Sequence, residues 1–254
     1  MEMPLKYSLS NPELGASPVA FSLVVPCYLD APHLKRNALE LASYLSLASF
    51  KWEILFVEDG SPDNTREAVY ETVAELQRRG HAARALFHPV NMGRGKAVTD
   101  GILAARGQVV GFIDIDLEHR MDSLLPMIRK VIAGEADVVV GKRAIVNGLA
   151  KPLRVICSHA YRLLAHLLLD LPVSDTECGL KVFDRRKILP VVAKTLDPRW
   201  FWDTEVVHRS YLDGLTVAEH SVLFVEDPSK RSTVRLIPDV IAYLRAILRH
   251  RRSV

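Results

Sequence analysis

Short apolar runs alternate with amphipathic segments along the chain from Phe21 onwards. Runs rich in Val, Ile, Leu and Phe predict buried strands at 21–26, 54–57, 83–87, 109–113 and 137–140. Between them, apolar residues three or four positions apart predict helices at 34–48, 65–79, 96–105 and 124–133. Repeated strand–helix units form mostly parallel sheets. We therefore expect an α/β fold in which helices flank a mostly parallel sheet.

The alternation is less regular beyond Gly141. The pattern there predicts helices at 152–169 and 202–212, strands at 178–183 and 217–225, and a last helix from Pro238. Residues 1–18 contain three prolines and are expected to form a loose leader. We expect one domain over residues 19–235, followed by an amphipathic basic helix over residues 236–254.

Composition narrows the class of protein. Hydrophobic residues make up 49% and charged residues 25%, as in globular proteins. The net charge is only +3 and basic residues do not alternate with aromatic ones, so no nucleic acid partner is expected. The cysteines, Cys27, Cys157 and Cys178, lack metal-ligand spacing, and neither a signal peptide nor a membrane span is evident. We expect a cytoplasmic location.

Three acidic residues, Asp114, Asp116 and Glu118, follow the fourth predicted strand. On an extended chain alternate side chains share a face, and grouped carboxylates suit Mg²⁺ or Mn²⁺ bound together with a diphosphate. A solvated acidic strand end is the alternative interpretation. His119 is expected to be an ordinary turn residue, with extension of the metal-ligand set as the alternative.

The segments that follow the first two strands contain Pro26, Tyr28 and Asp30, and Glu58 and Asp59, respectively. Acidic groups at the ends of parallel strands suit hydrogen bonds to a base or ribose, on which Tyr28 can stack. Generic turn formation is the alternative.

A glycine-rich helix start at residues 91–98 contains Arg94 and Lys96. Its backbone N–H groups and these cations are expected to face anionic phosphates, although the spacing is not that of a Walker loop.

Five ordered motifs resemble those of one family, the polyprenyl-phosphate hexosyltransferases, which include the dolichol-phosphate mannose and glucose synthases within the inverting GT-A glycosyltransferases of family 2. The motifs lie at residues 24–28, 57–61, 93–97, 114–119 and 175–183. The resemblance covers residues 20–235 and implies a GT-A catalytic domain. It also implies that Asp59 and Asp114 contact the nucleotide, while Asp116 and Glu118 hold the metal.

The resemblance further implies an acceptor-phosphate site made by Arg143, Arg154 and Ser158. Arg154 and Ser158 are four residues apart and share a helical face, where they suit a phosphate. Their alternative role is that of ordinary surface residues at a helix start.

Catalytic roles are implied for Asp116, Asp203 and Arg231. Asp203 would face the hexose, with Trp202 as an apolar wall, and Lys230 and Arg231 would close over the diphosphate. At least one of the consecutive aromatic residues 200–202 is expected to face a ligand or a lipid, because a helix points them in different directions.

These features predict transfer of a hexose from UDP-glucose, or from GDP-mannose, to a polyprenyl or dolichyl phosphate or a similar phosphate. Such an acceptor is ionised and needs no general base. A hydroxyl acceptor would need one, with Asp203 as first candidate, and a nucleotidyltransferase is a further alternative.

Two roles fit the last helix: peripheral contact with the cytoplasmic membrane face, or capping of the core or of a homodimer.

Overall fold

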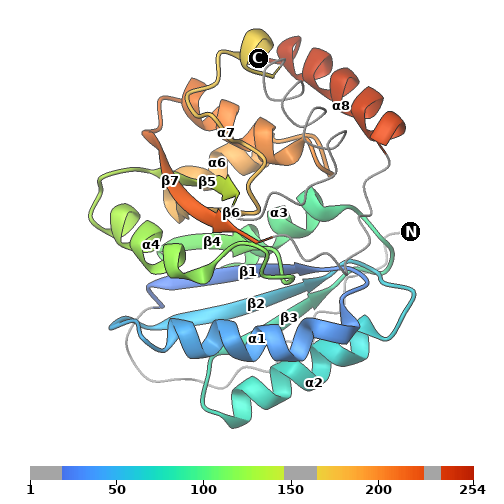
Figure 1. Ribbon diagram of the computed structural model, residues 1–254, viewed down its shortest axis with the longest axis vertical. Coiled ribbons are helices and arrows are strands. Elements are labelled where there is room, and N and C mark those ends of the chain that lie inside the picture. The colour runs from blue at the N-terminus through green and yellow to red at the C-terminus, as the bar shows by residue number, and fades with distance from the viewer. Residues whose placement is uncertain (1–18, 146–164, 226–235) are drawn as a thin grey trace, which may run out of the picture.

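The structure, a computed structural model, describes residues 19–145, 165–225 and 236–254. Within these residues seven strands form one sheet in the order β3-β2-β1-β4-β6-β5-β7 (Figure 1). The strands are β1 (Phe21–Cys27), β2 (Trp52–Glu58), β3 (Ala83–Phe87), β4 (Val109–Ile113), β5 (Val138–Ile145), β6 (Leu180–Asp184) and β7 (Val217–Phe224). Only β6 is antiparallel to its neighbours, β4 and β5. The predicted α/β class with a mostly parallel sheet is confirmed.

Helices cover both faces of the sheet. They are α1 (Ala31–Leu45), α2 (Thr65–Arg78), α3 (Arg94–Ala104), α4 (Leu124–Ile132), α6 (Arg185–Lys194), α7 (Trp202–Leu212) and α8 (Leu236–Arg251), with a short 3-10 helix, η1 (Met121–Ser123). Side chains of α1, α2 and α4 share one core, and those of α3, α6 and α7 share the other. Because neighbouring strand residues point to opposite faces, Leu23 and Val25 enter the first core and Val24 the second.

Two helices depart most from the prediction. Helix α1 begins at Ala31, three residues before the first predicted position, and Pro32 lies in its first turn, where a missing N–H is tolerated. Helix α6 was not predicted, because its basic first turn and Pro190 hide the helical pattern. The Asp184 side chain caps α6 by accepting the backbone N–H of Lys187 at 3.0 Å. Of the predicted helix at 152–169, residues 165–169 are described and are helical.

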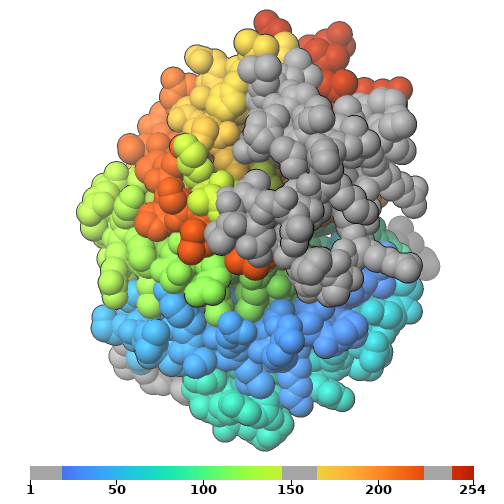
Figure 2. All heavy atoms as spheres, in the orientation of Figure 1, coloured from blue at the N-terminus to red at the C-terminus, as the bar shows by residue number. Residues whose placement is uncertain are grey.

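Helix α7 is buried on every side from Trp202 to Ser210. It lies between the sheet and α8, which is at the far end of the molecule from α1 and α2 in the space-filling view (Figure 2). The Tyr243 hydroxyl lies 2.5 Å from that of Thr204, and Nδ1 of His208 lies 2.8 Å from Nε2 of His250. Helix α8 therefore caps this domain's own core. No described helix is long and apolar enough to cross a membrane.

The contact between His208 and His250 predicts acid sensitivity of the fold. Burial, reinforced by His250, holds the pKa of His208 below its ordinary value of 6.5. Below pH 6.5 the unfolded chain therefore binds a proton that the folded chain excludes. The free energy of unfolding should be highest above pH 6.5 and should fall as the pH drops below it. Urea unfolding from pH 7.5 to pH 4.5 measures this, and His208→Gln should show a shallower fall; parallel profiles would contradict the assignment.

Candidate functional site

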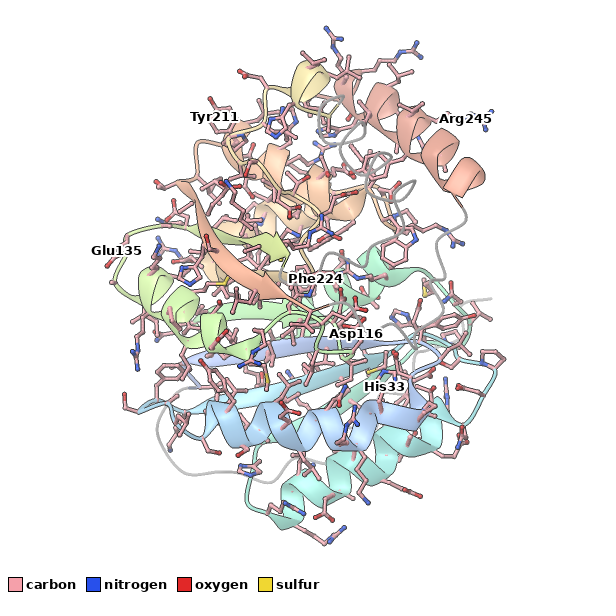
Figure 3. All side chains as sticks on the ribbon, in the orientation of Figure 1. His33, Asp116, Glu135, Tyr211, Phe224 and Arg245 are labelled. Atoms are coloured by element: carbon pink, nitrogen blue, oxygen red, sulfur yellow. The ribbon has the colours of Figure 1, made fainter. Side chains whose placement is uncertain are left out.

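The candidate site lies at the carboxyl ends of β1, β2 and β4, where the acidic motifs of the sequence follow their strands. In Figure 3 Asp116 is drawn in the middle of the molecule, between Phe224 and His33, while Tyr211 and Arg245 lie towards the end formed by α7 and α8. Residues from both halves of the chain meet at this edge, as expected for an open α/β sheet.

The acidic segment after β4 is a turn. The backbone N–H of Leu117 donates to the carbonyl of Asp114 at 3.3 Å, and Leu117 has a φ of 55°. The expectation that Asp114, Asp116 and Glu118 share one face of an extended chain is therefore wrong. Instead the Asp116 carboxylate accepts the backbone N–H of Glu118 at 3.3 Å, which closes a tight local loop.

Arg94, the first residue of α3, binds the first of these acids. Its Nε donates to Asp114 Oδ1 at 2.8 Å and its Nη2 to Asp114 Oδ2 at 3.0 Å. The remaining nitrogen, Nη1, donates to Asp203 Oδ2 at 2.5 Å. Burial alone would lower the pKa of Arg94, but the two carboxylates outweigh burial and raise the pKa above its ordinary value. This guanidinium thus joins β4, α3 and α7.

Asp203 is held by a second cation, Lys181 of β6. The Lys181 ammonium is fully buried and donates to Asp203 Oδ1 and, at 2.7 Å, to the carbonyl of Cys178. Because Arg94 occupies the other oxygen, both oxygens of Asp203 accept from cations, and the residue is only 3% exposed. Asp203 is therefore placed to organise cations, and poorly placed to take a proton from a substrate.

The tryptophan beside this network is Trp200. Trp200 is 46% exposed, and its ring centroid lies 5.7 Å from the guanidinium carbon of Arg94. The ring centroid of Phe112 lies 5.2 Å from the same carbon. The expectation that Trp202 forms a wall to the sugar is wrong, because Trp202 is fully buried and donates to Thr99. Of the three consecutive aromatics, Trp200 is the one that is exposed.

The turns after β1 and β2 differ in accessibility. Tyr28 is exposed, and its backbone N–H donates to the Asp30 carboxylate at 2.7 Å. Pro26 and Glu58 are buried within β1 and β2, and Glu58 pairs with Arg66 at 3.1 Å. Of the predicted nucleotide-binding residues after β1 and β2, Tyr28 and Asp30 are therefore the more exposed.

Asp59 is buried and has three internal partners. Its carboxylate accepts the backbone N–H groups of Met92 and Gly93, both at 2.9 Å, and contacts the His88 ring at 2.6 Å. Sequence reasoning missed His88, whose partners come from other elements. Asp59 is placed to shape the loop before α3.

The start of α3 is not an open anion site. The Met92 and Gly93 amides bind Asp59, and the backbone N–H of Lys96 donates to the carbonyl of Pro198 at 3.0 Å. The Lys96 ammonium pairs with Asp100 at 2.5 Å. Of the groups expected to face phosphates, Arg94 is the one directed to the acidic segment.

Arg143, in the second half of β5, is bound to acidic residues. Its Nε and Nη2 donate to the two oxygens of Asp175 at 2.8 and 2.9 Å, and Nη2 also lies 3.5 Å from Glu177. Burial opposes its charge, but Asp175 raises the pKa of Arg143 above its ordinary value. The other predicted basic and acceptor residues, Arg154, Ser158, Lys230 and Arg231, lie outside the described residues.

The acidic segment fits a metal only in part. Among the described residues no three His, Cys, Asp or Glu side chains are grouped so as to hold a metal ion. Asp114, Asp116 and Glu118 are all partly exposed and carry hard oxygen donors, and Asp114 is in addition bound to Arg94. Mg²⁺ is commonly held by one or two carboxylates together with substrate phosphates, and this donor set fits that mode.

His119 is a buried residue rather than the ordinary turn residue expected. It makes a β-bridge with Phe224, and its ring packs on that side chain at 5.2 Å between centroids. Neither ring nitrogen has a hydrogen-bond partner among the described residues. Burial lowers the pKa of His119 to about 4, so the ring is neutral near pH 7.

Comparison with known proteins places the chain among glycosyltransferases. Residues 22–188 match the family model described as Glycosyl transferase family 2. Glycosyltransferase AglD from Haloferax volcanii is 33% identical, over 92% of this chain and 37% of AglD. Dolichyl-phosphate beta-glucosyltransferase ALG5A from Trichomonas vaginalis is 31% identical, over 92% of this chain and 74% of that protein. The chain thus spans little more than a third of AglD and about three quarters of ALG5A.

Solved structures show the same fold. Glucosyl-3-phosphoglycerate synthase from Mycobacterium tuberculosis, in complex with Mn²⁺, UDP and glucosyl-3-phosphoglycerate, matches with a TM-score of 0.63 and 18% identity, over 91% of this chain and 78% of that one. S. aureus TarS in complex with UDP-GlcNAc matches with a TM-score of 0.59 and 16% identity, over 91% of this chain and 66% of that one. The predicted GT-A fold is confirmed.

Gly179 tests how tightly the ion network is packed. A Cβ at this position would lie 2.0 Å from Asp114 Oδ2, so Gly179→Ala should displace the carboxylate. We expect a loss of about 1–3 kcal/mol in unfolding free energy, measured in urea. In an Asp114→Ala background the same change should cost much less, because the obstructing oxygen is gone. Equal costs in both backgrounds would show that Asp114 is not the obstacle.

Proposed function

Because the chain belongs to glycosyl transferase family 2, we propose that it transfers a hexose from a nucleotide sugar to a polyprenyl or dolichyl phosphate, with inversion at the anomeric carbon. Relatives named dolichyl-phosphate beta-glucosyltransferases, at 31% identity in Trichomonas vaginalis and 25% in Saccharomyces cerevisiae, support this acceptor and favour glucose as the hexose. UDP-glucose is accordingly the proposed donor, with GDP-mannose as the alternative.

The observation that most supports a phosphate acceptor is that both oxygens of the Asp203 carboxylate are already bound by cations. Transfer to a hydroxyl needs a carboxylate that can take its proton, and Asp203 was the predicted base. Both of its oxygens are bound, to Arg94 and to Lys181. A phosphate monoester needs no base, since it is ionised near neutral pH and has only to be positioned. The site therefore supports a phosphate acceptor better than a hydroxyl.

The donor would lie at the edge that contains Tyr28 and Asp30, with its diphosphate towards the segment after β4. Asp116 and Glu118 would hold Mg²⁺ or Mn²⁺, with Asp114 kept in place by Arg94 beside them. When bound, the cation would neutralise charge on the departing nucleoside diphosphate. Lys230 and Arg231 are proposed, from the sequence, to add positive charge at the same group.

In the proposed reaction an oxygen of the acceptor phosphate attacks the anomeric carbon from the face opposite the nucleotide. The bond from that carbon to the diphosphate oxygen breaks, and the nucleoside diphosphate leaves with the electron pair. No proton has to move. The protein's task is then to hold two anionic groups in line, which requires fixed cations such as Arg143, while Arg94 keeps Asp114 and Asp203 in place.

A lipid acceptor requires access to a membrane surface. We retain from the sequence the proposal of peripheral contact at the cytoplasmic face. Helix α8 packs on α7 through Tyr243 and His250, and its Arg245, Arg249 and Arg251 are exposed. Such exposed bases suit anionic headgroups.

A transfer assay tests the proposal directly. The purified protein is incubated with UDP-glucose or GDP-mannose, with or without Mg²⁺ or Mn²⁺, and with a short-chain polyprenyl phosphate or the matching free polyprenol. Mass spectrometry should detect a hexosyl polyprenyl phosphate from UDP-glucose, only with a divalent cation and only from the phosphate. Product from the free alcohol would instead favour a hydroxyl acceptor.

Arg143 provides a more specific test of the acceptor site. Arg143→Lys keeps a charge for Asp175 but loses the forked donor geometry, so the fold should persist. The KM for the polyprenyl phosphate should rise roughly tenfold to a hundredfold, with little change in the KM for the nucleotide sugar. Lys142→Ala is the control, because Lys142 is exposed and only loosely paired with Glu219 at 3.6 Å. An unchanged acceptor KM in Arg143→Lys would remove Arg143 from the site.

A further inference from the structure

His88 occupies a central position that the proposed chemistry does not use. It follows β3 directly and is buried, with its ring between two carboxylates of different elements. Its Nδ1 lies 2.6 Å from Asp59 Oδ1, and its Nε2 lies 3.1 Å from Asp100 Oδ2 of α3. Sequence spacing gives no hint of this arrangement, because the three residues come from three separate segments.

The backbone of His88 is fixed as well. Its N–H donates to the carbonyl of Glu58 at 2.8 Å, and its carbonyl accepts from the Arg66 guanidinium at 2.6 Å. The ring therefore has little freedom to turn away from Asp59 and Asp100. A residue held in this way transmits any change in its own charge to both partners.

The two contacts determine the charge state of the ring. A neutral imidazole has one N–H, so it can donate to only one carboxylate, whereas imidazolium donates from both nitrogens. The carboxylates of Asp59 and Asp100 lie at opposite ring nitrogens, and a ring that donates to both of them must be protonated. In agreement, Asp100 and then Asp59 raise the pKa of His88 from 6.5 to about 9, against the effect of burial.

Asp59 carries the effect of His88 to the loop before α3. The same carboxylate that contacts His88 accepts the backbone N–H groups of Met92 and Gly93. Gly93 has a φ of 106° and packs against the carbonyl of Pro198, so this loop conformation is demanding. Arg94, which binds Asp114 and Asp203, is the next residue.

We propose that His88 is a positioning residue for donor binding: its imidazolium ties the turn after β2 to α3 and so holds the loop that places Arg94. This inference rests on the proposed nucleotide-sugar donor. Loss of the proton would leave Asp59 and Asp100 facing a ring that can serve only one of them. The loop would then lose an anchor, and affinity for the nucleotide would fall.

The predicted pH dependence follows from the surrounding charges. The charged groups around His88 are Glu58 and Asp59 at the end of β2, Arg66 of α2, and Lys96 and Asp100 of α3. Since the pKa of His88 is raised, its contribution is complete near pH 7 and is lost as the pH rises through about 9. The affinity for the nucleotide should therefore decrease at alkaline pH, and this decrease forms an alkaline limb in the pH profile.

The test is the affinity for UDP with Mg²⁺, measured by calorimetry between pH 7 and pH 10 on the full chain. The wild-type protein should bind more weakly above pH 9. His88→Gln should bind roughly tenfold to a hundredfold more weakly at pH 7 and should lack the limb attributed to His88. Any titration of UDP itself is common to both proteins. The control is His81→Gln, at the other end of β3, which should match the wild type in affinity and pH profile.

The Asp100→Asn variant distinguishes a positioning role of His88 in nucleotide binding from a role in the stability of the fold alone. Removing this carboxylate takes away one partner of the imidazolium, so the alkaline limb should move down by about one pH unit or more. This variant also decides the matter if His88→Gln does not fold. An unshifted limb in Asp100→Asn, or wild-type affinity of a folded His88→Gln at every pH, would overturn the inference. Failure of the wild-type protein to bind any nucleoside diphosphate would count against the proposed function instead.

Discussion

The guanidinium of Arg94 is the group on which the arrangement of the site depends. It binds Asp114 after β4 and Asp203 at the start of α7, and Lys181 of β6 supplies a second cation to Asp203. Buried charges are tolerated only when they are paired, and removing one member leaves its partner uncompensated. This balance of two cations and two carboxylates therefore fixes segments that are far apart in the sequence.

The elements of the fold were largely predictable, because parallel strands covered on both faces appear as continuous apolar runs. The structure departs from the predicted elements where the local sequence pattern did not determine the backbone conformation. Pro190 and the basic first turn concealed α6, and the left-handed backbone of Leu117 turned an expected extended segment into a tight loop. A non-glycine residue at positive φ has no marker in a single sequence.

The candidate site was predictable as a set of strand-end motifs but not as a set of contacts. Spacing identified Asp114 as important and the family resemblance identified Asp203, but neither gave any indication that one arginine binds both. The buried position of Trp202 and the outward position of Trp200 depend on tertiary packing at the start of α7, which local sequence patterns do not reveal. His88 was missed for the same reason, since its partners are brought to it only by folding.

The pairing of β1 with β4 has a kinetic meaning. Strands β1, β2 and β3 are neighbours in both sequence and space, whereas β4 joins β1 only after two intervening strand–helix units. Pairings between distant segments form slowly, and a chain emerges from the ribosome N-terminus first. A nascent chain thus carries Arg94 and Asp114 before β6 and α7 supply Lys181 and Asp203. The candidate site is consequently completed late in synthesis, when the C-terminal half has docked.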